Sequence, residues 1–392
     1  MLAGGVAAQA SFSAVLFGVA AVAPAIRRQY GLTLTQAGVV IAAVSFGLVA
    51  TLLLWGIVSD RVGERAVLAT GLVLCAGGLV ATAFARSYGE LVGGLTAAGA
   101  FGAATQSATG RAVMGWFGPE ERGLALGIRQ TAVPVGGAVA AVALPALTEH
   151  LGLRAAFVAL AGGCLGAAIV SAALIRSGGG DDHHGLERPL RDPRIWLLCV
   201  GSTFYVVTQI SVLGFLVLFL HDSRGVSNGA AAVALAVTQI LGGVMRIAAG
   251  RWSDRFQARV RPLRQLGILL AAATVTAALL VHAALWLVVP ALVVAGTLSL
   301  AWNGLSYTAA AEAAGRARSG AAIGLQQTFL AAGSIVGPIA FAAVVRHSSW
   351  RVAFLAAATS PLLGYVLLTP LSEEAAGVDP SVQTGRAQTR QP

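Results

Sequence analysis

The chain has 392 residues, of which 57% are hydrophobic and 11% are charged, and its formal net charge is +10. Soluble domains carry about 25% charged residues, so this composition excludes an ordinary water-soluble domain and indicates a membrane protein. The basic residues are all arginines and are spread among short loops. This dispersal argues against a nucleic-acid interface, which would gather them on one soluble surface.

Apolar segments of about 20 residues are long enough to cross a hydrocarbon core of about 30 Å as helices. The first begins close to Met1, with no basic region before it and no cleavage site after it, so we expect it to be retained. The missing basic tail leaves open whether Met1 is the true start. The sequence predicts an all-α integral membrane protein with twelve spans, at 5–26, 35–57, 66–85, 89–114, 123–147, 153–175, 195–220, 229–250, 264–282, 285–311, 320–345 and 351–371.

The distribution of arginine predicts the orientation of these spans. If Met1 is cytoplasmic, sixteen arginines fall in the loops and tail on that side and seven on the other. Cytoplasmic loops of membrane proteins carry such an excess of basic residues. We therefore expect a multi-pass protein of the cell membrane with both termini in the cytoplasm.

Gly, Pro and charged residues interrupt the apolar pattern once, near the middle of the chain. We expect a six-helix bundle over 1–175, a linker over 176–194, a second six-helix bundle over 195–371 and a disordered cytoplasmic tail over 372–392. Asp181, Asp182, His183 and His184 lie together in the linker, but adjacent polar residues in a Gly-flanked loop are usually solvated. We expect no metal site.

Two motifs recur between the halves. The turn Gly56-Ile-Val-Ser-Asp60-Arg61 returns as Gly250-Arg-Trp-Ser-Asp254-Arg255, and Gly127-Ile-Arg-Gln-Thr131 returns as Gly324-Leu-Gln-Gln-Thr328. The first turn, G-x-x-x-D-R-x-G-x-R, resembles the signature between the second and third helices of the major facilitator superfamily of secondary transporters. The resemblance covers residues 1–371 and implies twelve helices in two pseudo-symmetric six-helix bundles, which alternately expose a central cavity to either side.

The resemblance also implies a cytoplasmic gate. In that family the charged turns pair with the ends of neighbouring helices when the cavity faces outward. On this chain the corresponding gate residues are Asp60, Arg61, Arg65, Asp254 and Arg255.

Strongly polar side chains inside the predicted spans are confined to seven helices. Arg, Gln, Asn and Glu occur in helices 1, 4, 5, 7, 8, 10 and 11 but are absent from the interiors of 3, 6, 9 and 12. Polar groups in hydrocarbon are costly unless they are satisfied, so this pattern indicates a wet central cavity. In the family that the turn resembles, helices 3, 6, 9 and 12 face the lipid.

Arg246 is the leading candidate for substrate binding. It lies eight residues, or about 12 Å of helix rise, before Asp254. Its position resembles that of the helix-eight arginine that holds the substrate anion in monocarboxylate, oxalate/formate and nitrate porters. Because arginine cannot lose its proton, Arg246 either grips a substrate carboxylate through its planar fork or pairs with a backbone carbonyl or with Glu312.

Two further arginines lie inside predicted spans. Arg129 has the neutral Gln326 as its counterpart in the repeat, which suits an asymmetric anionic ligand, although Arg129 could equally brace the gate. Arg111 lies five residues from Trp116, near the cytoplasmic end of its helix, and suits a gate or entrance better than a central site. Direct contact between Arg111 and the substrate stays an alternative.

Neutral polar residues complete the expected site. Gln130 and Gln327 are related by the repeat and could face each other across the cavity, and Gln239 is a weaker candidate of the same kind. Asn303 and Tyr307 in the tenth helix could add hydrogen bonds, with core packing as the alternative for Tyr307.

No phosphate-binding loop G-x-x-x-x-G-K-[ST] occurs, because the chain contains no lysine. We therefore expect no cofactor. We expect transport to be driven by an ion gradient, most simply of protons, or by substrate exchange. Glu312 is the acid nearest to a span interior and is the candidate proton site, with a salt bridge to Arg111 or Arg246 as the alternative.

These residues predict a transporter of a small organic anion, most simply a carboxylate, that acts as a monomer in the lipid bilayer and binds no nucleic acid. The basis is a positive cavity in which Arg111, Arg129 and Arg246 face at most one acid, Glu312. A proton-coupled multidrug or metabolite efflux pump is the first alternative, although Thr96 replaces the helix-four arginine of many such pumps. A transporter-like solute sensor is the second. An enzyme is not expected, because the spans hold no nucleophile–base pair.

Overall fold

The structure, a computed structural model, describes residues 1–175 and 191–371, and every regular element within these ranges is helical. The expected linker lies mostly outside the described residues, as do its polar cluster at 181–184 and the expected tail. The helices of the first half are α1 (Leu2–Tyr30), α2 (Leu34–Val62), α3 (Glu64–Ala83), α4 (Tyr88–Gly102), α5 (Ala104–Trp116), α6 (Arg122–Leu151) and α7 (Leu153–Leu174).

The second half repeats this order. Its long helices are α8 (Pro193–Leu218), α9 (Asn228–Phe256), α10 (Val260–Leu279), α11 (Leu285–Ala301), α12 (Asn303–Ala314), α13 (Ser319–His347) and α14 (Trp350–Leu367). Two short helices, η2 (Phe219–Ser223) and η3 (Arg316–Arg318), follow α8 and precede α13.

In the described part of the chain, eleven helical segments are long and apolar enough to cross a membrane. The sequence predicts twelve spans, and the difference lies in the fourth. There the chain forms α4 and α5, of 15 and 13 residues, which are separated at Ala103. A break in the second half, at Trp302, divides α11 from α12 in the same way.

The turn between α2 and α3 shows why its motif contains glycine. Gly63 alone joins the two helices, and its φ of 92° is a conformation that residues with a Cβ rarely adopt. At the other end of α2, Thr33 and Gln36 form a reciprocal capping box that satisfies free backbone amides of the first turn. The motif therefore produces a sharp reversal that places Asp60 at the very end of α2.

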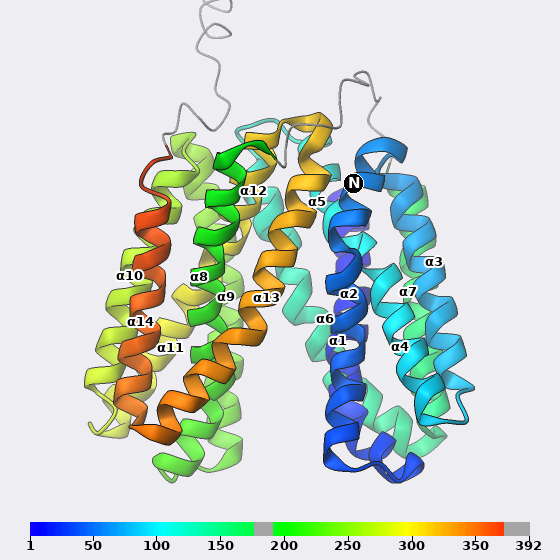
Figure 1. The fold of residues 1–392 in the computed structure, drawn as a ribbon, viewed down its shortest axis with the longest axis horizontal. Helices are drawn as coiled ribbons and strands as arrows, with labels where there is room; N and C mark the ends of the chain where they lie inside the picture. The colour runs from blue at the N-terminus through cyan, green and yellow to red at the C-terminus, as the bar shows by residue number, and fades with distance from the viewer. Residues whose placement is uncertain (176–190, 372–392) are drawn as a thin grey trace, which may run out of the picture.

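The helices form two groups, α1–α7 and α8–α14, which meet at one end of the molecule and diverge toward the other (Figure 1). We call the end that carries Asp60, Asp254 and the N-terminus the closed end, and the opposite one the splayed end. Contacts between the groups run mainly between α2 and α13, α6 and α9, α5 and α13, and α6 and α12. The main contacts of α3, α7, α10 and α14 stay within their own group, as expected for helices on the outer, lipid-facing side.

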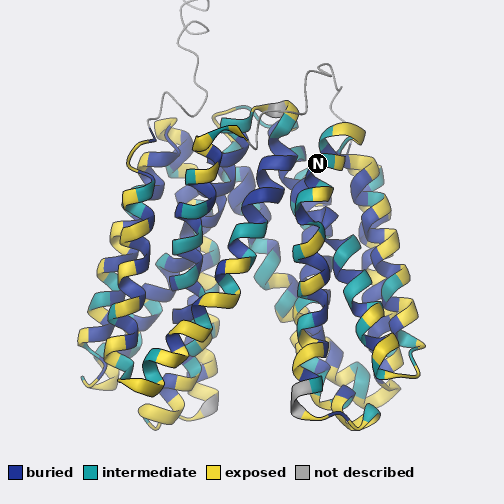
Figure 2. Ribbon diagram, in the orientation of Figure 1, coloured by how far each residue is buried: buried dark blue, intermediate teal, exposed yellow. Residues whose placement is uncertain are grey.

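Burial of the side chains also differs between the closed end and the splayed end (Figure 2). Residues 303–311 of α12 and 319–327 of α13 are buried without interruption, which means that these helix segments are enclosed on all sides. Farther along α13, toward the splayed end, Ile335 and Ile339 are exposed. One apolar cluster, containing Val113 and Leu126 from the first half and Trp302 from the second, crosses between the groups.

Candidate functional site

At the closed end a carboxylate from the first half caps a helix of the second. The two side-chain oxygens of Asp60 accept hydrogen bonds from the backbone amides of Gly320 and Ala321, at 2.9 and 2.7 Å. These amides lie in the first turn of α13, where backbone N–H groups have no partner within the helix. The helix dipole also favours a negative charge at this position, so Asp60 ties α2 to α13 by both effects.

A carboxylate of the second half forms the equivalent cap on a helix of the first half. Asp254, at the end of α9, accepts hydrogen bonds from the amides of Gly123 and Leu124 at 2.9 and 2.7 Å, in the first turn of α6. The recurring turns of the sequence thus form two crossed caps, each tying one half to the other.

Glycines allow the backbones to touch beside each cap. A Cβ on Gly56 would collide with the carbonyl oxygen of Gly320, and a Cβ on Gly250 would collide with that of Gly123. Each of these glycines of the recurring turn stands four residues before its aspartate. The two contacts bring α2 against α13 and α9 against α6 closely enough for the carboxylates to reach the amides.

Ion pairs surround both caps. Arg111 bonds Asp60 at 3.1 Å and also pairs with Glu64. On the other side, Arg259 bonds Asp254 at 2.5 Å and Glu312 at 3.0 Å. Burial alone would lower the pKa of Arg259, but the charges and hydrogen bonds of Glu312 and Asp254 outweigh it and raise the pKa above its usual value.

These contacts correct two expectations. Arg111 is not an uncompensated cavity cation, because Asp60 and Glu64 neutralise it at the closed end. Glu312 pairs with Arg259 and, at 3.6 Å, with Arg122 of the first half, and not with Arg111 or Arg246. The turn after α9 and the start of α6 bring Arg259 and Arg122 to the end of α12, closer than the arginines inside the spans.

Three of the expected gate residues lie at the edge of this arrangement. Arg61, Arg65 and Arg255 are exposed at the closed end. The ion pairs of the two caps are instead made by Glu64, Arg111, Arg122, Arg259 and Glu312.

Arg246 lies deeper, at the contact between the two halves. It is 5% exposed, and its Nε and Nη1 donate to the backbone carbonyls of Leu300 and Gln130, at 2.9 and 2.7 Å. Leu300 belongs to its own half and Gln130 to the other. Within the described chain no carboxylate pairs with Arg246, so the carbonyl pairing is the alternative that this state of the molecule displays.

Tyr307 joins the two repeat-related glutamines. Its hydroxyl donates to Gln327 at 3.0 Å, and the side chain of Gln130 lies beside it. Gln327 in turn donates to Gln106 at 3.2 Å, across the contact between the halves. The structure therefore brings Gln130, Gln327 and Tyr307 together where the two groups of helices are in contact.

Arg129 is wholly buried, with its hydrogen bonds in the first group of helices and its guanidinium 5.9 Å from the ring of Tyr307 in the second. Its Nη2 donates to neutral acceptors at 3.2–3.4 Å, on Gln9 of α1 and Gln106 of α5. Its Nε and Nη1 have no hydrogen-bond partner in the described structure. The repeat-related Gln326 occupies the matching place in the second group, where it bonds Ser202 of α8 and Ser306 of α12.

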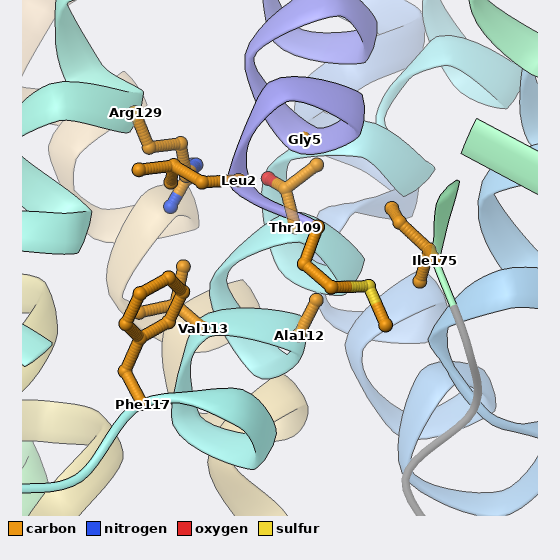
Figure 3. Close-up of a pocket in the computed structure, with 9 residues that line it drawn as sticks. Leu2, Gly5, Thr109, Ala112, Val113, Phe117, Arg129 and Ile175 are labelled. Carbon is orange, nitrogen blue, oxygen red and sulfur yellow. The ribbon is translucent and has the colours of Figure 1, made fainter. Parts of the chain in front are cut away.

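A narrow pocket opens beside Arg129 toward the closed end (Figure 3). The volume that the centre of a water molecule can occupy inside it is about 10 Å³, which is the size of a single water site. Its lining is apolar apart from Arg129 and Thr109, and it includes Met1, Leu2, Gly5, Ala112, Val113, Phe117 and Ile175. The pocket is too small for an organic substrate.

The last two candidates for substrate binding, Asn303 and Gln239, lie in the second group of helices. Asn303 is buried and donates to Gln209 at 3.3 Å, so it sits within the second group near the break at Trp302. Gln239 is half-buried on α9 and is not drawn into the cluster around Tyr307.

Sequence reasoning missed Glu64, Arg259 and the glycines Gly123 and Gly320. A signal for the glycines was present, because the recurring motif extends to G-x-x-x-G-[IL]-x-Q-T in both halves. Such small-residue spacing is typical of close helix contacts in membranes. Glu64 belongs to the charged turn itself, whereas nothing in the sequence pairs Arg259 with Glu312, 53 residues away.

Comparisons with known proteins agree with this architecture. A family model described as Major Facilitator Superfamily matches residues 4–331. The uncharacterized MFS-type transporter Rv2994 of Mycobacterium tuberculosis is 33% identical over 362 residues, which cover 90% of this chain and 80% of the relative. A probable sulfoacetate transporter of Cupriavidus necator, SauU, is 28% identical over 274 residues, 63% of this chain and 62% of the relative.

A solved structure shows the same fold. The MFS transporter FucP in its outward conformation superposes with a TM-score of 0.75, at 16% identity, over 94% of this chain and 97% of FucP.

Proposed function

This chain belongs to the major facilitator superfamily of secondary transporters, and we propose that it carries a small organic anion, most simply a carboxylate, held chiefly by Arg246. In the alternating-access cycle, the cavity between the two halves opens to one side of the membrane and then to the other. The protein is a multi-pass membrane transporter and not an enzyme.

The observation that carries the substrate class is the uncompensated positive charge between the halves. Arg129 and Arg246 have only neutral acceptors among the described residues. The acids nearest to them, Asp60, Glu64, Asp254 and Glu312, are engaged at the closed end. A site of this kind attracts anions.

The same charge argues against a cationic drug as substrate. Two unit charges about 4 Å apart, at an effective dielectric of about 20, repel by about 4 kcal/mol for each unpaired arginine. The relative described as a probable sulfoacetate transporter supports an organic anion, although this chain spans 62% of its length.

The arginine distribution supports a closed end that faces the cytoplasm. Arg61, Arg65, Arg122, Arg251 and Arg255 all lie there, which agrees with the excess of basic residues in cytoplasmic loops. The described state is then outward-facing, with both termini inside the cell. We further propose that the protein is a monomer of the cell membrane and couples transport to a proton gradient or to exchange.

Glu312 is the proposed proton site. Its carboxylate pairs with Arg259 within the second half and with Arg122 of the first half, so its protonation would weaken a contact between the halves at the closed end. Proton uptake at Glu312 would thus favour opening to the cytoplasm.

Uptake by proteoliposomes tests the substrate class directly. We expect uptake of at least one radiolabelled carboxylate or sulfonate from a panel and none of a lipophilic cation. Arg246→Lys keeps the charge but loses the planar fork, so it should weaken anion binding by about 1 to 3 kcal/mol. Arg246→Ala should abolish transport while the protein still inserts.

The alternatives give different results in the same assay. Uptake of lipophilic cations with every anion ignored would favour the efflux pump, and so would normal transport by Arg246→Ala. Binding of a solute without any uptake would favour a sensor.

A further inference from the structure

Arg246 reaches across the molecule to a backbone carbonyl that a proline has left without its usual donor. In an α-helix each carbonyl oxygen accepts from the amide four residues later. The residue four positions after Gln130 is Pro134, inside α6, and proline has no N–H. The carbonyl of Gln130 is thereby open to Arg246, which donates to it at 2.7 Å.

The second acceptor is open for a similar reason. Leu300 lies in the last turn of α11, which ends at Ala301 before the break at Trp302. The last four carbonyls of a helix have no partner within it. Arg246 therefore joins two backbone oxygens that the helices themselves cannot satisfy, one in each half of the molecule.

The backbones approach closely enough for this contact. A Cβ on Gly127 of α6 would lie 2.7 Å from the carbonyl oxygen of Arg246, so α6 and α9 touch one turn away from Gln130.

The contact between α2 and α13 serves as an internal comparison. There a Cβ on Gly324 would lie 2.6 Å from the carbonyl oxygen of Leu52, which is the same backbone contact in the other repeat. Leu52 thus stands where Arg246 stands, and Ala331 stands four residues after Gln327 as Pro134 does after Gln130. The arginine and the proline are both present at one contact and both absent from the other.

We propose that Pro134 is a positioning residue for Arg246, and that the pair latches α6 to α9 until a substrate anion takes the guanidinium from the Gln130 carbonyl. A hydrogen bond from arginine to an anion is stronger than one to a neutral carbonyl, so anion binding favours the exchange. The carbonyl then loses its partner from the other half, and the closed end is free to open. The second step rests on the proposed function, whereas the latch does not.

Thiol labelling at the closed end, without substrate, tests the latch. Ile323 is fully buried and packs across the halves, beside Gly110, so Ile323→Cys reports opening by faster labelling with a membrane-impermeant maleimide. Pro134→Ala restores the helix hydrogen bond and should speed labelling by roughly threefold to tenfold, the size expected for a weakened charge-assisted hydrogen bond. Arg246→Gln should speed it at least as much.

Two comparisons separate the latch from a general loosening of the helix. Pro145→Ala removes the other proline of α6, where no arginine docks, and should label like the parent protein. Pro134→Ala combined with Arg246→Gln should label no faster than Arg246→Gln alone, because both changes break one contact. Labelling of Pro134→Ala at the parent rate, or additive effects in the double variant, would overturn the latch.

A substrate arm tests the release step. Sulfoacetate at millimolar concentration is the probe, and it should speed labelling of the parent protein but not of Arg246→Gln. If neither it nor an anion taken up in the liposome assay speeds labelling, the release step is wrong. The protein could also take up cations while its labelling without substrate shows the pattern expected for the latch. That result would contradict the proposed function but not the latch.

Discussion

At the scale of single residues, the charge that separates the two repeats is hydrogen-bonded within one half and faces the other, because the Arg129 guanidinium lies 5.9 Å from the ring of Tyr307. Arg129 fills the slot among α1, α5 and α6 that Gln326 fills among α8, α12 and α13. The amide nitrogen of Gln326 bonds two serines there and its oxygen has no hydrogen-bond partner, whereas two nitrogens of the charged arginine have none in the described structure. Such a residue costs stability, and its retention is consistent with a role in binding an anion.

Replacing Arg129 by the residue of the other repeat separates stability from function. Arg129→Gln removes a buried unpaired charge, so we expect unfolding in detergent to require about 1 to 4 kcal/mol more, seen as a higher melting temperature. Anion uptake should fall at least tenfold. Gln326→Ala, which removes the amide that bonds Ser202 and Ser306 but keeps the hydrogen bond between the two serines, is the comparison and should lower the melting temperature. A less stable Arg129→Gln protein would show that unseen partners already satisfy the arginine.

At the scale of helices, the closed end depends on the first turns of α6 and α13. Their free amides are capped by Asp254 and Asp60 from the opposite half, and glycines beside each cap permit the approach. Each cap uses a turn that ends one helix to hold the beginning of another. Both caps therefore form or break together with the contact between the halves.

We expect Asp60→Asn and Asp254→Asn each to favour opening of the closed end. The amide keeps one acceptor but loses the charge that the helix dipole stabilises, a loss of about 1 to 2 kcal/mol. Labelling of Ile323→Cys should therefore become several-fold faster in either variant, and faster again in the double variant. Substrate binding should be retained.

The matched control is Asp222→Asn, which neutralises an exposed acid at the splayed end. It should leave labelling of Ile323→Cys unchanged. Equal rates in the parent protein and in Asp60→Asn would contradict the role of the caps.

At the scale of the whole molecule, the halves must separate at the closed end for transport to proceed. Gly243 of α9 and Thr131 of α6 face each other across the contact between the halves, deeper than the caps, since a Cβ on Gly243 would lie 3.9 Å from the Thr131 methyl. Cysteines at these two positions would carry their thiols on facing sides of this contact. We expect oxidation of Thr131→Cys/Gly243→Cys to stop uptake and a reductant to restore it.

The parent protein supplies a control for the oxidant. Cys75 and Cys164 have sulfur atoms 4.0 Å apart, but they join α3 and α7 within one half. A bond there leaves the halves free to move, so oxidised parent protein should keep its uptake. Full uptake by the crosslinked double variant would exclude separation of α6 from α9 as a step of transport.

The sequence by itself determined the family and the helical membrane fold, because span length, arginine placement and a recurring turn are local features. It also identified Asp60, Asp254, Arg246 and the Gln130–Gln327 pair as residues to examine. The repeat further indicated that the two halves would differ at Arg129.

Only the tertiary structure decided which of these residues meet. Glu312 could have paired with any nearby arginine, and Arg259 and Arg122 reach it because the turn after α9 and the start of α6 converge on α12. Arg111 faced the same choice and is held by Asp60 and Glu64. The partner of Arg246 was undetermined for the same reason. The partner of a long side chain is whatever group the packed helices bring within its reach, and in these ion pairs that group lies more than 45 residues away in the sequence.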